Sequence, residues 1–505
     1  MAVAVLESRA AIGTDAPPVT IEVFLSGGLP SFSIVGLPET AVRESKDRVR
    51  GALVSSGFSF PQERITVSLG PADMPKGGGR FDLAIALGIL LASKAIEPPP
   101  FSGLEFYGEL ALTGELRPVR GLLPAALGAR VRSNAVLVPM ANGTEATLAG
   151  AVVYPAGSLL EVTAHLTGDR RIDVLPATLR PLGRPPAEDL KDVIGQADAK
   201  RALEIAAAGG HNLLLIGPPG TGKSMLARRL SGLLPPMNEA EAIETAAIDS
   251  VLGKPLELSQ WRRRPFRAPH HTASGPALVG GGSVPMPGEI SRAHNGVLFL
   301  DELPEFKRNV LEVLREPLES GSITISRAAR QCEFPARFQL VAAMNPCPCG
   351  FHGDPRGGCI CSGDRVAAYR GKISGPLLDR IDLHVEVGRI HRSLLRDGGA
   401  DGESSRVIAD RIAVARDRAL HRGGGRNADL QGEELAQACQ LDDQSWSLLE
   451  QASKRFNLST RACHRILRVA RTIADLAGAD RVENRHLAEA LSFRALDQKR
   501  LPSGC

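Results

Sequence analysis

The fold is decided by one stretch of sequence, residues 217–224, which reads Gly217-Pro218-Pro219-Gly220-Thr221-Gly222-Lys223-Ser224. An apolar run of strand length, 211–216, precedes it, and a helical pattern begins near Met225. Glycines in such a turn let backbone N–H groups point at phosphate oxygens, and a helix N-terminus adds favourable partial charge. The strand–loop–helix context therefore predicts a nucleoside triphosphate site, in which Lys223 reaches the β- and γ-phosphates and Ser224 ligates Mg²⁺. The alternative, a Gly-rich turn that contains a lysine by chance, would not require this context.

Two acids follow a second apolar run. Residues 296–300 form a predicted central parallel strand, and Asp301 and Glu302 stand at its C-terminal end. Ligands of open α/β sheets bind at that edge, so we expect Asp301 to contact Mg²⁺ and Glu302 to orient and polarise the attacking water. Acids after a strand, taken alone, are more often helix N-caps. Downstream of a phosphate-binding loop, the catalytic interpretation is favoured.

Asn345 and Arg380 are candidates for two further parts of a hydrolytic site. Asn345 ends the strand-like run 341–344 and could hold the lytic water, although it also suits a turn because a proline follows. Arg380 lies between Asp379 and Asp382. An arginine supplied to the γ-phosphate of a neighbouring subunit stabilises transition-state charge, whereas an ion pair with a flanking acid would contribute little. The spacing alone does not choose between these two roles.

The chain divides into three units and two linkers. Residues 1–168 alternate strand-like and helical runs and predict a mixed α/β unit. Four prolines among arginines in 169–190 indicate a linker, and residues 191–390 form an α/β core around the phosphate-binding loop. A Gly-, Asp- and Ser-rich segment, 391–405, leads to residues 406–505, where several amphipathic helices and no strong strand pattern predict an all-helical domain.

The composition predicts a soluble protein of the cytoplasm. Hydrophobic residues make up 43% of the 505 residues, which is enough for sizeable cores and argues against global disorder. The first residues lack the basic start and apolar core of a secretory signal, and the longest apolar run, 83–93, is too short to span a membrane. The formal net charge of +4 permits nucleic-acid binding without indicating it, so such a role depends on local clusters of basic residues.

Four of the eight cysteines lie close together, Cys347 with Cys349 and Cys359 with Cys361. Four thiolates can form a tetrahedral Zn²⁺ site, although the spacing within each pair is tighter than the usual two to four intervening residues. Reduced cysteines in a loop, or a redox pair, are the alternatives. A zinc ion here would be structural. His352, inside the loop, would either replace one ligand or be a solvated residue.

Two clusters of basic residues are candidate contacts for DNA. The first, 261–271, mixes arginines with Trp261 and other rings, which suits single-stranded nucleic acid because cations meet phosphates while rings stack on bases. The second runs from Lys454 to Arg471 and places three cations on one helical face, namely Arg461, Arg465 and Arg468. A solvated basic surface is the alternative for both clusters.

Motifs from most of the chain resemble those of a known family. They are 192–196, 200–206, the phosphate-binding loop, 287–291, 299–303, 343–350 and 377–382. Together they resemble the ComM/YifB family of magnesium-chelatase-like AAA+ ATPases. The resemblance implies a hexameric ring that binds ATP and Mg²⁺ and has a helical lid, with Asn345 as first sensor, Arg380 as arginine finger and Arg461, beside the helix cap Ser459, as second sensor. ComM proteins are implicated in DNA branch migration during natural transformation.

The first unit resembles the proteolytic domain of Lon-type proteases. The residues that carry this resemblance are 108–119 and 136–139. Those enzymes use a Ser-Lys dyad, in which the lysine activates the serine. The lysine position matches Leu123, which cannot accept a proton, and the serine region matches 77–82, which contains no serine. We therefore expect a Lon-like fold without peptidase activity, in which Lys76 and Arg80 either bind an anion or DNA or belong to a surface turn.

Three functions from different classes are compatible with the sequence. The leading hypothesis, which rests on the resemblance, is a homohexameric ATPase that couples ATP hydrolysis to remodelling of single-stranded or branched DNA, as a helicase or in branch migration. The second is a chelatase-type motor that acts on a partner protein. The third is a protein-remodelling ATPase, since the missing dyad argues against proteolysis but not against unfolding.

Overall fold

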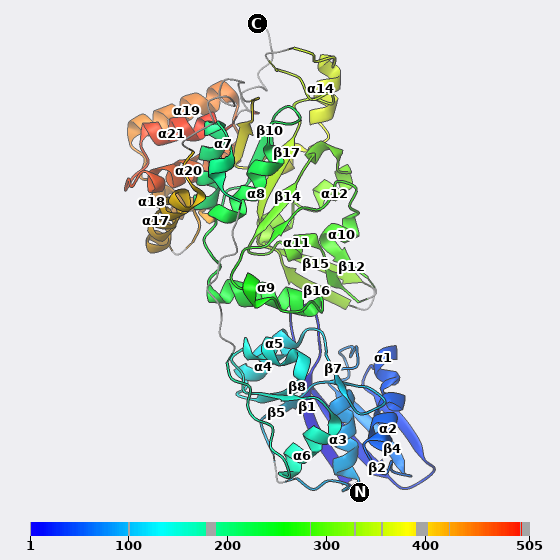
Figure 1. Ribbon diagram of the computed structural model, residues 1–505. Coiled ribbons are helices and arrows are strands. Elements are labelled where there is room, and N and C mark those ends of the chain that lie inside the picture. The colour runs from blue at the N-terminus through cyan, green and yellow to red at the C-terminus, as the bar shows by residue number, and fades with distance from the viewer. Residues whose placement is uncertain are drawn as a thin grey trace.

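The computed structural model describes residues 2–98, 101–177, 188–282, 284–327, 330–354, 357–389, 402–423, 425–494 and 496. Residues 178–187 of the expected linker 169–190, and 391–401 of the expected linker 391–405, lie outside the described residues. Two α/β parts lie at opposite ends of an elongated molecule, and a group of helices packs beside the second part (Figure 1).

A seven-stranded sheet organises the N-terminal part, in the order β3-β4-β2-β1-β5-β8-β9. Its strands are β1 (Ala2–Arg9), β2 (Pro18–Ser26), β3 (Ser31–Val35), β4 (Arg64–Gly70), β5 (Leu104–Phe106), β8 (Ala135–Pro139) and β9 (Val153–Ala156). The sheet is antiparallel from β1 through β2 to β4 and parallel elsewhere. A small hairpin, β6 (Glu109–Leu110) with β7 (Leu116–Arg117), lies outside it. This part is therefore mixed α/β, as its alternating patterns predict.

Helix α3 (Asp82–Ala92) forms the centre of the N-terminal core. It packs on β1 and β2, and every residue except Leu91 is buried, which accounts for its apolar sequence after Asp82. The remaining helices of this part are α1 (Thr40–Arg43), α2 (Ser45–Ser55), α4 (Leu122–Val131), α5 (Gly143–Thr147) and α6 (Leu159–Thr167).

A second sheet has five parallel strands in the order β11-β14-β17-β10-β18. They are β10 (Leu213–Ile216), β11 (Phe266–Arg267), β14 (Val297–Leu300), β17 (Gln339–Met344) and β18 (Leu383–Glu386). Each residue of β10, β14 and β17 is buried, because helices and loops cover both faces of the sheet. Parallel order brings the C-terminal ends of β14, β17 and β10 to one edge, where the predicted polar residues follow each strand.

Short helices and two hairpins surround this sheet. The helices are α7 (Ala197–Gly209), α8 (Lys223–Leu233), α9 (Glu239–Val251), α10 (Gly275–Val279), α11 (Glu289–Arg292), α12 (Arg308–Glu312), α13 (Pro317–Ser320), α14 (Gly363–Arg370) and α15 (Gly375–Leu378). The hairpins are β12 (Gly280–Gly281) with β13 (Met286–Pro287), and β15 (Ser322–Arg327) with β16 (Arg330–Pro335).

The C-terminal part is a group of helices on one side of the five-stranded sheet (Figure 1). They are α17 (Ser405–Gly423), α18 (Gly432–Cys439), α19 (Asp443–Phe456), α20 (Thr460–Leu476) and α21 (Asn484–Ser492). Helices α17 and α20 both pack against α7. Ile412 and Ile473 share one hydrophobic cluster with Leu213 of β10, so this helical part and the sheet have a continuous core.

Helix α9 of the second part meets α4 of the N-terminal part at the junction between them (Figure 1). The Gly121 N–H donates to the Ser250 carbonyl oxygen at 2.9 Å. Trp261 belongs to the hydrophobic cluster of this junction and is only 8% exposed. The interpretation of Trp261 as a stacking platform for DNA bases is therefore wrong, because burial between the two parts leaves its ring inaccessible. Within the described residues, no helix is long and apolar enough to cross a membrane.

Candidate functional site

The predicted phosphate-binding loop connects β10 to α8. The strand ends at Ile216 and the helix begins at Lys223. Gly222, just before the helix, has a φ of 88°, in the left-handed region that favours glycine. Gly217 is needed for another reason, since a Cβ on it would lie 2.1 Å from the Val387 carbonyl oxygen. The glycines thus allow a tight loop at a helix N-terminus, the arrangement that binds phosphate.

This loop borders a cavity of about 430 Å³. The cavity is lined by residues 219–225, Asp301, Glu302, Met344 and Asn345. Residues predicted from three separate stretches are thus brought together at the carboxyl edge of the sheet. Arg380 and Arg461 are not among the lining residues.

Lys223 lines this cavity and has three hydrogen-bond acceptors. Its ammonium donates to the carbonyl oxygens of Gly217 at 2.7 Å and Pro218 at 2.9 Å, and to Oδ1 of Asn345 at 3.2 Å. Burial lowers the pKa of Lys223, while the nearby carboxylates of Asp301 and Glu302 act in the opposite direction. Charged phosphate oxygens would be stronger acceptors for this ammonium than these three neutral oxygens.

Ser224 and Asp301 form an oxygen pair next to this lysine. The Ser224 hydroxyl donates to Oδ2 of Asp301 at 2.5 Å, and Oδ1 of Asp301 accepts the N–H of Glu302 at 2.9 Å. Mg²⁺ prefers hydroxyl and carboxylate oxygens and usually takes only one or two of them from the protein. The donor set therefore fits the predicted Mg²⁺ site.

Glu302 projects from the end of β14 and has a neighbour that the sequence did not indicate. Its side chain is 52% exposed, and Nδ1 of His271 lies 3.0 Å from its Oε2. The His271 ring also packs edge-on to Phe306 and lies with its centroid 4.1 Å from that of His270. The backbone of Glu302 has a φ of 52°, a strained conformation of the kind found at functional sites. The only sequence signal for His271 is the His270-His271 pair at the end of the first basic cluster.

Comparison with known proteins now assigns the family. The family model "Magnesium chelatase, subunit ChlI" matches residues 189–395, "Subunit ChlI of Mg-chelatase" matches 21–142, and "Magnesium chelatase, subunit ChlI C-terminal" matches 402–494. The chain is 50% identical over 501 residues to the competence protein ComM of Haemophilus influenzae, with 98% of each chain covered. The chain belongs to the ComM/YifB family of magnesium-chelatase-like AAA+ ATPases.

Two other relatives support the same assignment. The uncharacterized protein YifB of Escherichia coli is 47% identical over 499 residues, covering 99% of this chain and 98% of YifB. The magnesium-chelatase 38 kDa subunit of Cereibacter sphaeroides is 25% identical over 60% of this chain and 90% of that subunit. ComM/YifB-family membership implies an ATPase that uses ATP and Mg²⁺.

Arg380 of this ComM/YifB-family chain is held away from the cavity. Its guanidinium pairs with the Glu319 carboxylate and donates to the Pro376 carbonyl oxygen at 2.6 Å. The alternative interpretation, an ion pair with Asp379 or Asp382, names the wrong acid, because the guanidinium pairs with Glu319 on α13. Arg380 is only 6% exposed, whereas the Glu319 side chain is 60% exposed.

Arg461 is the exposed member of the basic face on α20. Ser459 caps this helix by accepting the Ala462 N–H, as expected. Two other cations of the predicted face have internal partners, because Arg465 pairs with Asp382 at 2.8 Å and Arg468 donates to the Leu430 carbonyl oxygen at 2.7 Å. The interpretation of Arg465 and Arg468 as contacts for DNA phosphates is therefore wrong.

Asp382 anchors the helical part to the sheet. Burial raises the pKa of its carboxyl group, but His211, Arg465 and the Asn212 N–H outweigh burial and hold the pKa well below its usual range. Arg471, further along α20, is fully buried and pairs with Asp475 at 2.7 Å. The second basic cluster thus serves mainly to fix α20 in place.

Most arginines of the first basic cluster also have partners within the fold. Arg264 pairs with Glu241 at 3.0 Å, and Arg267 pairs with Glu289 at 2.7 Å. Arg262 donates to the Met237 carbonyl oxygen at 2.5 Å. These partners lie on α9, on α11 and just before α9, so the arginines tie this segment to neighbouring elements of the second part and do not form a continuous basic surface.

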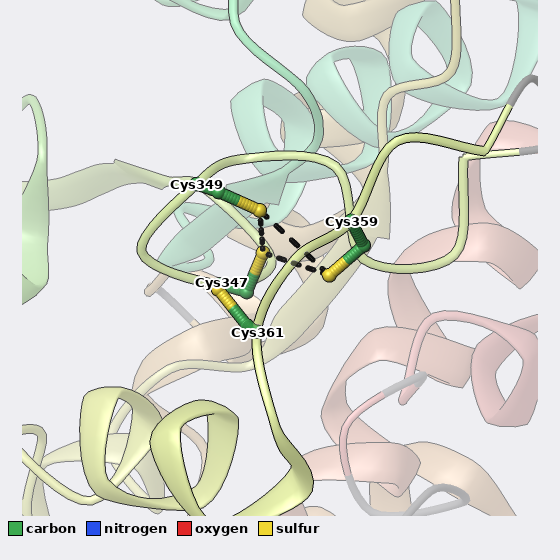
Figure 2. Close-up of side chains that lie close together, drawn as sticks. All are labelled: Cys347, Cys349, Cys359 and Cys361. Carbon is green, nitrogen blue, oxygen red and sulfur yellow. Dashed lines mark hydrogen bonds between the residues drawn. The ribbon is translucent and has the colours of Figure 1, made fainter.

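The four predicted cysteines meet at one point just beyond β17. Figure 2 shows the sulfurs of Cys347, Cys349 and Cys359 turned toward one another, with Cys361 beside them. All four sulfurs lie within 4.8 Å of one another, and none forms a disulfide. The N–H groups of Phe351 and Ile360 lower the pKa of the Cys349 thiol to about 6. His352 contributes its backbone N–H to Cys347 at 3.3 Å.

The glycine-rich turn of the N-terminal part differs from both interpretations offered for it. Lys76 is fully buried and donates to the Pro71 carbonyl oxygen, and Arg80, 3% exposed, donates to the carbonyl oxygens of Arg9 and Arg120. Burial lowers the pKa of both cations. Neither the anion- or DNA-binding role nor the surface turn is correct, because internal carbonyl groups take up these cations. Leu123 is completely buried in α4.

Proposed function

We propose that this chain is a ring-forming ATPase that hydrolyses ATP in the cavity beside the phosphate-binding loop and uses the energy to remodel DNA. One observation carries the proposal. Lys223, Ser224, Asp301, Glu302 and Asn345 line a single cavity at the carboxyl edge of a parallel sheet. That set supplies a phosphate cation, metal-binding oxygens and a carboxylate for water, which is what phosphoryl transfer requires.

Each of these side chains has a defined task in the proposed reaction. Lys223 exchanges its carbonyl acceptors for oxygens of the β- and γ-phosphates, and Asn345, its neighbour, holds the attacking water. Ser224 and Asp301 hold the ion, and Mg²⁺ neutralises charge on the phosphates when bound. The Glu302 carboxylate orients the water and draws its proton.

The proposed active site is completed by a second copy of the chain. Arg380 does not line the cavity of its own chain, and its partner Glu319 lies at the surface. In a homohexameric ring, Arg380 of one subunit would leave Glu319 and stabilise charge on the γ-phosphate bound by the next subunit. Arg461 would reach the same nucleotide from the helical part, which acts as the lid.

DNA is the substrate that we propose for the motor, in single-stranded or branched form. The support is the relation to a protein named for competence, together with exposed cations that the structure leaves at the surface, Arg263, Lys454 and Arg455. A chelatase-type or protein-remodelling motor that acts on a partner protein is the second candidate. The similarity to the magnesium-chelatase 38 kDa subunit favours it.

We also propose a role for each part of the chain. Residues 1–168 form a Lon-like domain without a peptidase dyad, 191–390 the ATPase core and 406–505 the lid, with 169–190 and 391–405 as linkers. The cysteine cluster binds a structural Zn²⁺. The protein works in the cytoplasm and needs no membrane.

ATP hydrolysis measured against a panel of DNA structures tests this function. We expect forked or single-stranded DNA to raise the steady-state rate of the full-length protein several-fold above its rate without DNA. Equal rates with single-stranded, double-stranded and forked DNA would contradict the DNA proposal. Stimulation by a polypeptide such as casein, without its digestion, would favour the protein-remodelling candidate instead.

A further inference from the structure

The cysteine cluster lies against the phosphate-binding loop. Cys347 follows Asn345 by two residues, and Asn345 accepts a hydrogen bond from Lys223. Gly350 packs on Pro219 so closely that a Cβ on Gly350 would lie 2.6 Å from Cδ of Pro219. The conformation of the cysteine segment therefore determines where one catalytic side chain lies and supports one wall of the phosphate-binding loop.

The same segment is tied to the next strand. Asp354, buried at its side chain, pairs with Arg389 at 2.9 Å, and the Arg389 guanidinium lies over the Phe351 ring at 5.3 Å. Arg389 follows β18, where the Gly388 carbonyl oxygen accepts the side-chain N–H of Gln196 at 2.6 Å. The cysteine segment thus bridges the ends of β17 and β18 on either side of the strand that leads into the phosphate-binding loop.

The geometry of the thiols suits a tetrahedral metal ion. Two of the sulfur–sulfur distances, Cys347 to Cys359 and Cys349 to Cys359, are 3.8 and 3.7 Å, and Cys347 to Cys349 is 3.3 Å. A Zn–S bond of about 2.3 Å in tetrahedral geometry places neighbouring sulfurs roughly 3.8 Å apart. A disulfide would need about 2.05 Å. Two of these separations match a tetrahedral site, all four sulfurs lie within 4.8 Å of one another, and four thiolates are the donor set of structural zinc.

We propose that Cys347, Cys349, Cys359 and Cys361 bind one Zn²⁺ and that this ion holds the segment against Pro219 and Asn345, so that nucleotide binding and hydrolysis depend on it. The inference rests on the proposed ATPase function for its hydrolysis part only. Zinc adds no step to the reaction. It fixes the backbone between Asn345 and Gly350, which a loop of this glycine content would not hold by itself.

The first test measures zinc content and nucleotide handling in the full-length protein. We expect about one zinc per chain, and its loss in Cys359→Ser, with kcat for ATP lowered by roughly tenfold or more because misplaced catalytic groups lose rate steeply. Binding of a fluorescent ATP analogue should weaken several-fold. Cys463→Ser is the matched control, since Cys463 is a free cysteine outside the cluster, on α20, and both properties should be unchanged. Cys359→His should recover zinc and activity, because imidazole is also a zinc ligand.

A second variant tests whether the position of the cysteine segment affects nucleotide binding when the zinc site itself is intact. Gly350→Ala leaves all four thiols in place but adds a Cβ against Pro219 at a backbone φ of 89°. It should retain zinc while nucleotide binding weakens. Purified protein without zinc that also fails to take up added Zn²⁺ would overturn the site. Zinc-free Cys359→Ser with wild-type nucleotide affinity would overturn the coupling. If the wild type holds zinc but hydrolyses no ATP, the proposed function fails while analogue binding still tests the coupling.

Discussion

Two glycine-rich turns in this chain look alike in sequence but line cavities of different chemistry in the structure. Gly217–Ser224 and the segment 76–82 each carry glycines beside buried cations and each lead into a helix, α8 or α3. In the first turn, Lys223 lines a cavity together with a serine and two acids, and it donates to the carbonyl oxygens of Gly217 and Pro218. In the second, Arg80 also lines a cavity and donates to backbone carbonyl oxygens, but no lysine or serine is among the described residues beside it there.

The difference shows that a cation next to glycines indicates a nucleotide site only when the other groups that phosphate chemistry needs line the same cavity. Gly77, Gly78 and Gly79 line a cavity of about 870 Å³ at the junction, larger than the one beside the phosphate-binding loop. Volume alone does not make it the reaction site, because, in the part of the chain that the structure describes, neither a lysine nor a serine is among its lining residues. The smaller cavity holds the convergent lysine, serine and acids, and we place the chemistry there.

The largest effect is expected at the proposed boundary between subunits. Arg380→Ala should lower ATP hydrolysis by roughly 10³-fold, the scale on which arginine fingers act. Mixing this variant with Lys223→Met subunits should restore part of the rate, because some neighbours would combine an intact Lys223 with an intact Arg380. Steady-state ATPase assays of mixed and unmixed proteins provide the measurement. If mixing restores no activity, then either Arg380 does not act in the ATP site or each ATP site is formed by one chain alone.

A matched pair of substitutions tests the two turns directly. Lys223→Met should lower ATP hydrolysis by roughly 10²-fold or more through loss of charge stabilisation, with little effect on folding. Arg80→Met should leave the rate per folded molecule unchanged but lower the free energy of unfolding by about 1–3 kcal/mol, because buried carbonyl groups lose their donor. Denaturant unfolding and ATPase assays on both variants give the comparison. A hydrolysis defect in folded Arg80→Met would mean that the N-terminal turn takes part in nucleotide chemistry.

The smallest effect is expected at His271. Removing its ring in His271→Ala frees the Glu302 side chain, whose rotamer freedom is worth about 1 kcal/mol, so the rate should fall by about fivefold. His270→Ala is the control, since His271 and not His270 contacts the carboxylate. A loss as large as that of Lys223→Met would assign His271 a direct part in the reaction.

Local patterns were enough to predict which residues line the cavity, but not the contacts that the arginines make. The loop, the acids after β14 and Asn345 after β17 each depend on one strand and the residues beside it, and parallel order brings them together. The partner of Arg465 lies 83 residues away and that of Arg380 lies 61 residues away. A helical spacing cannot show such partners, so the basic face on α20 was interpreted as exposed. Trp261 was misplaced for the same reason, because its burial depends on a different part of the chain.

The central claim is that the cavity beside Gly217–Ser224 hydrolyses ATP rather than only binding it. The most direct measurement compares ATP binding and single-turnover hydrolysis in the wild type and Glu302→Gln. We expect the variant to bind ATP within a few-fold of the wild type while its hydrolysis falls by roughly 10²- to 10⁴-fold, because the amide cannot take a proton from water. Hydrolysis at the wild-type rate in Glu302→Gln would contradict it.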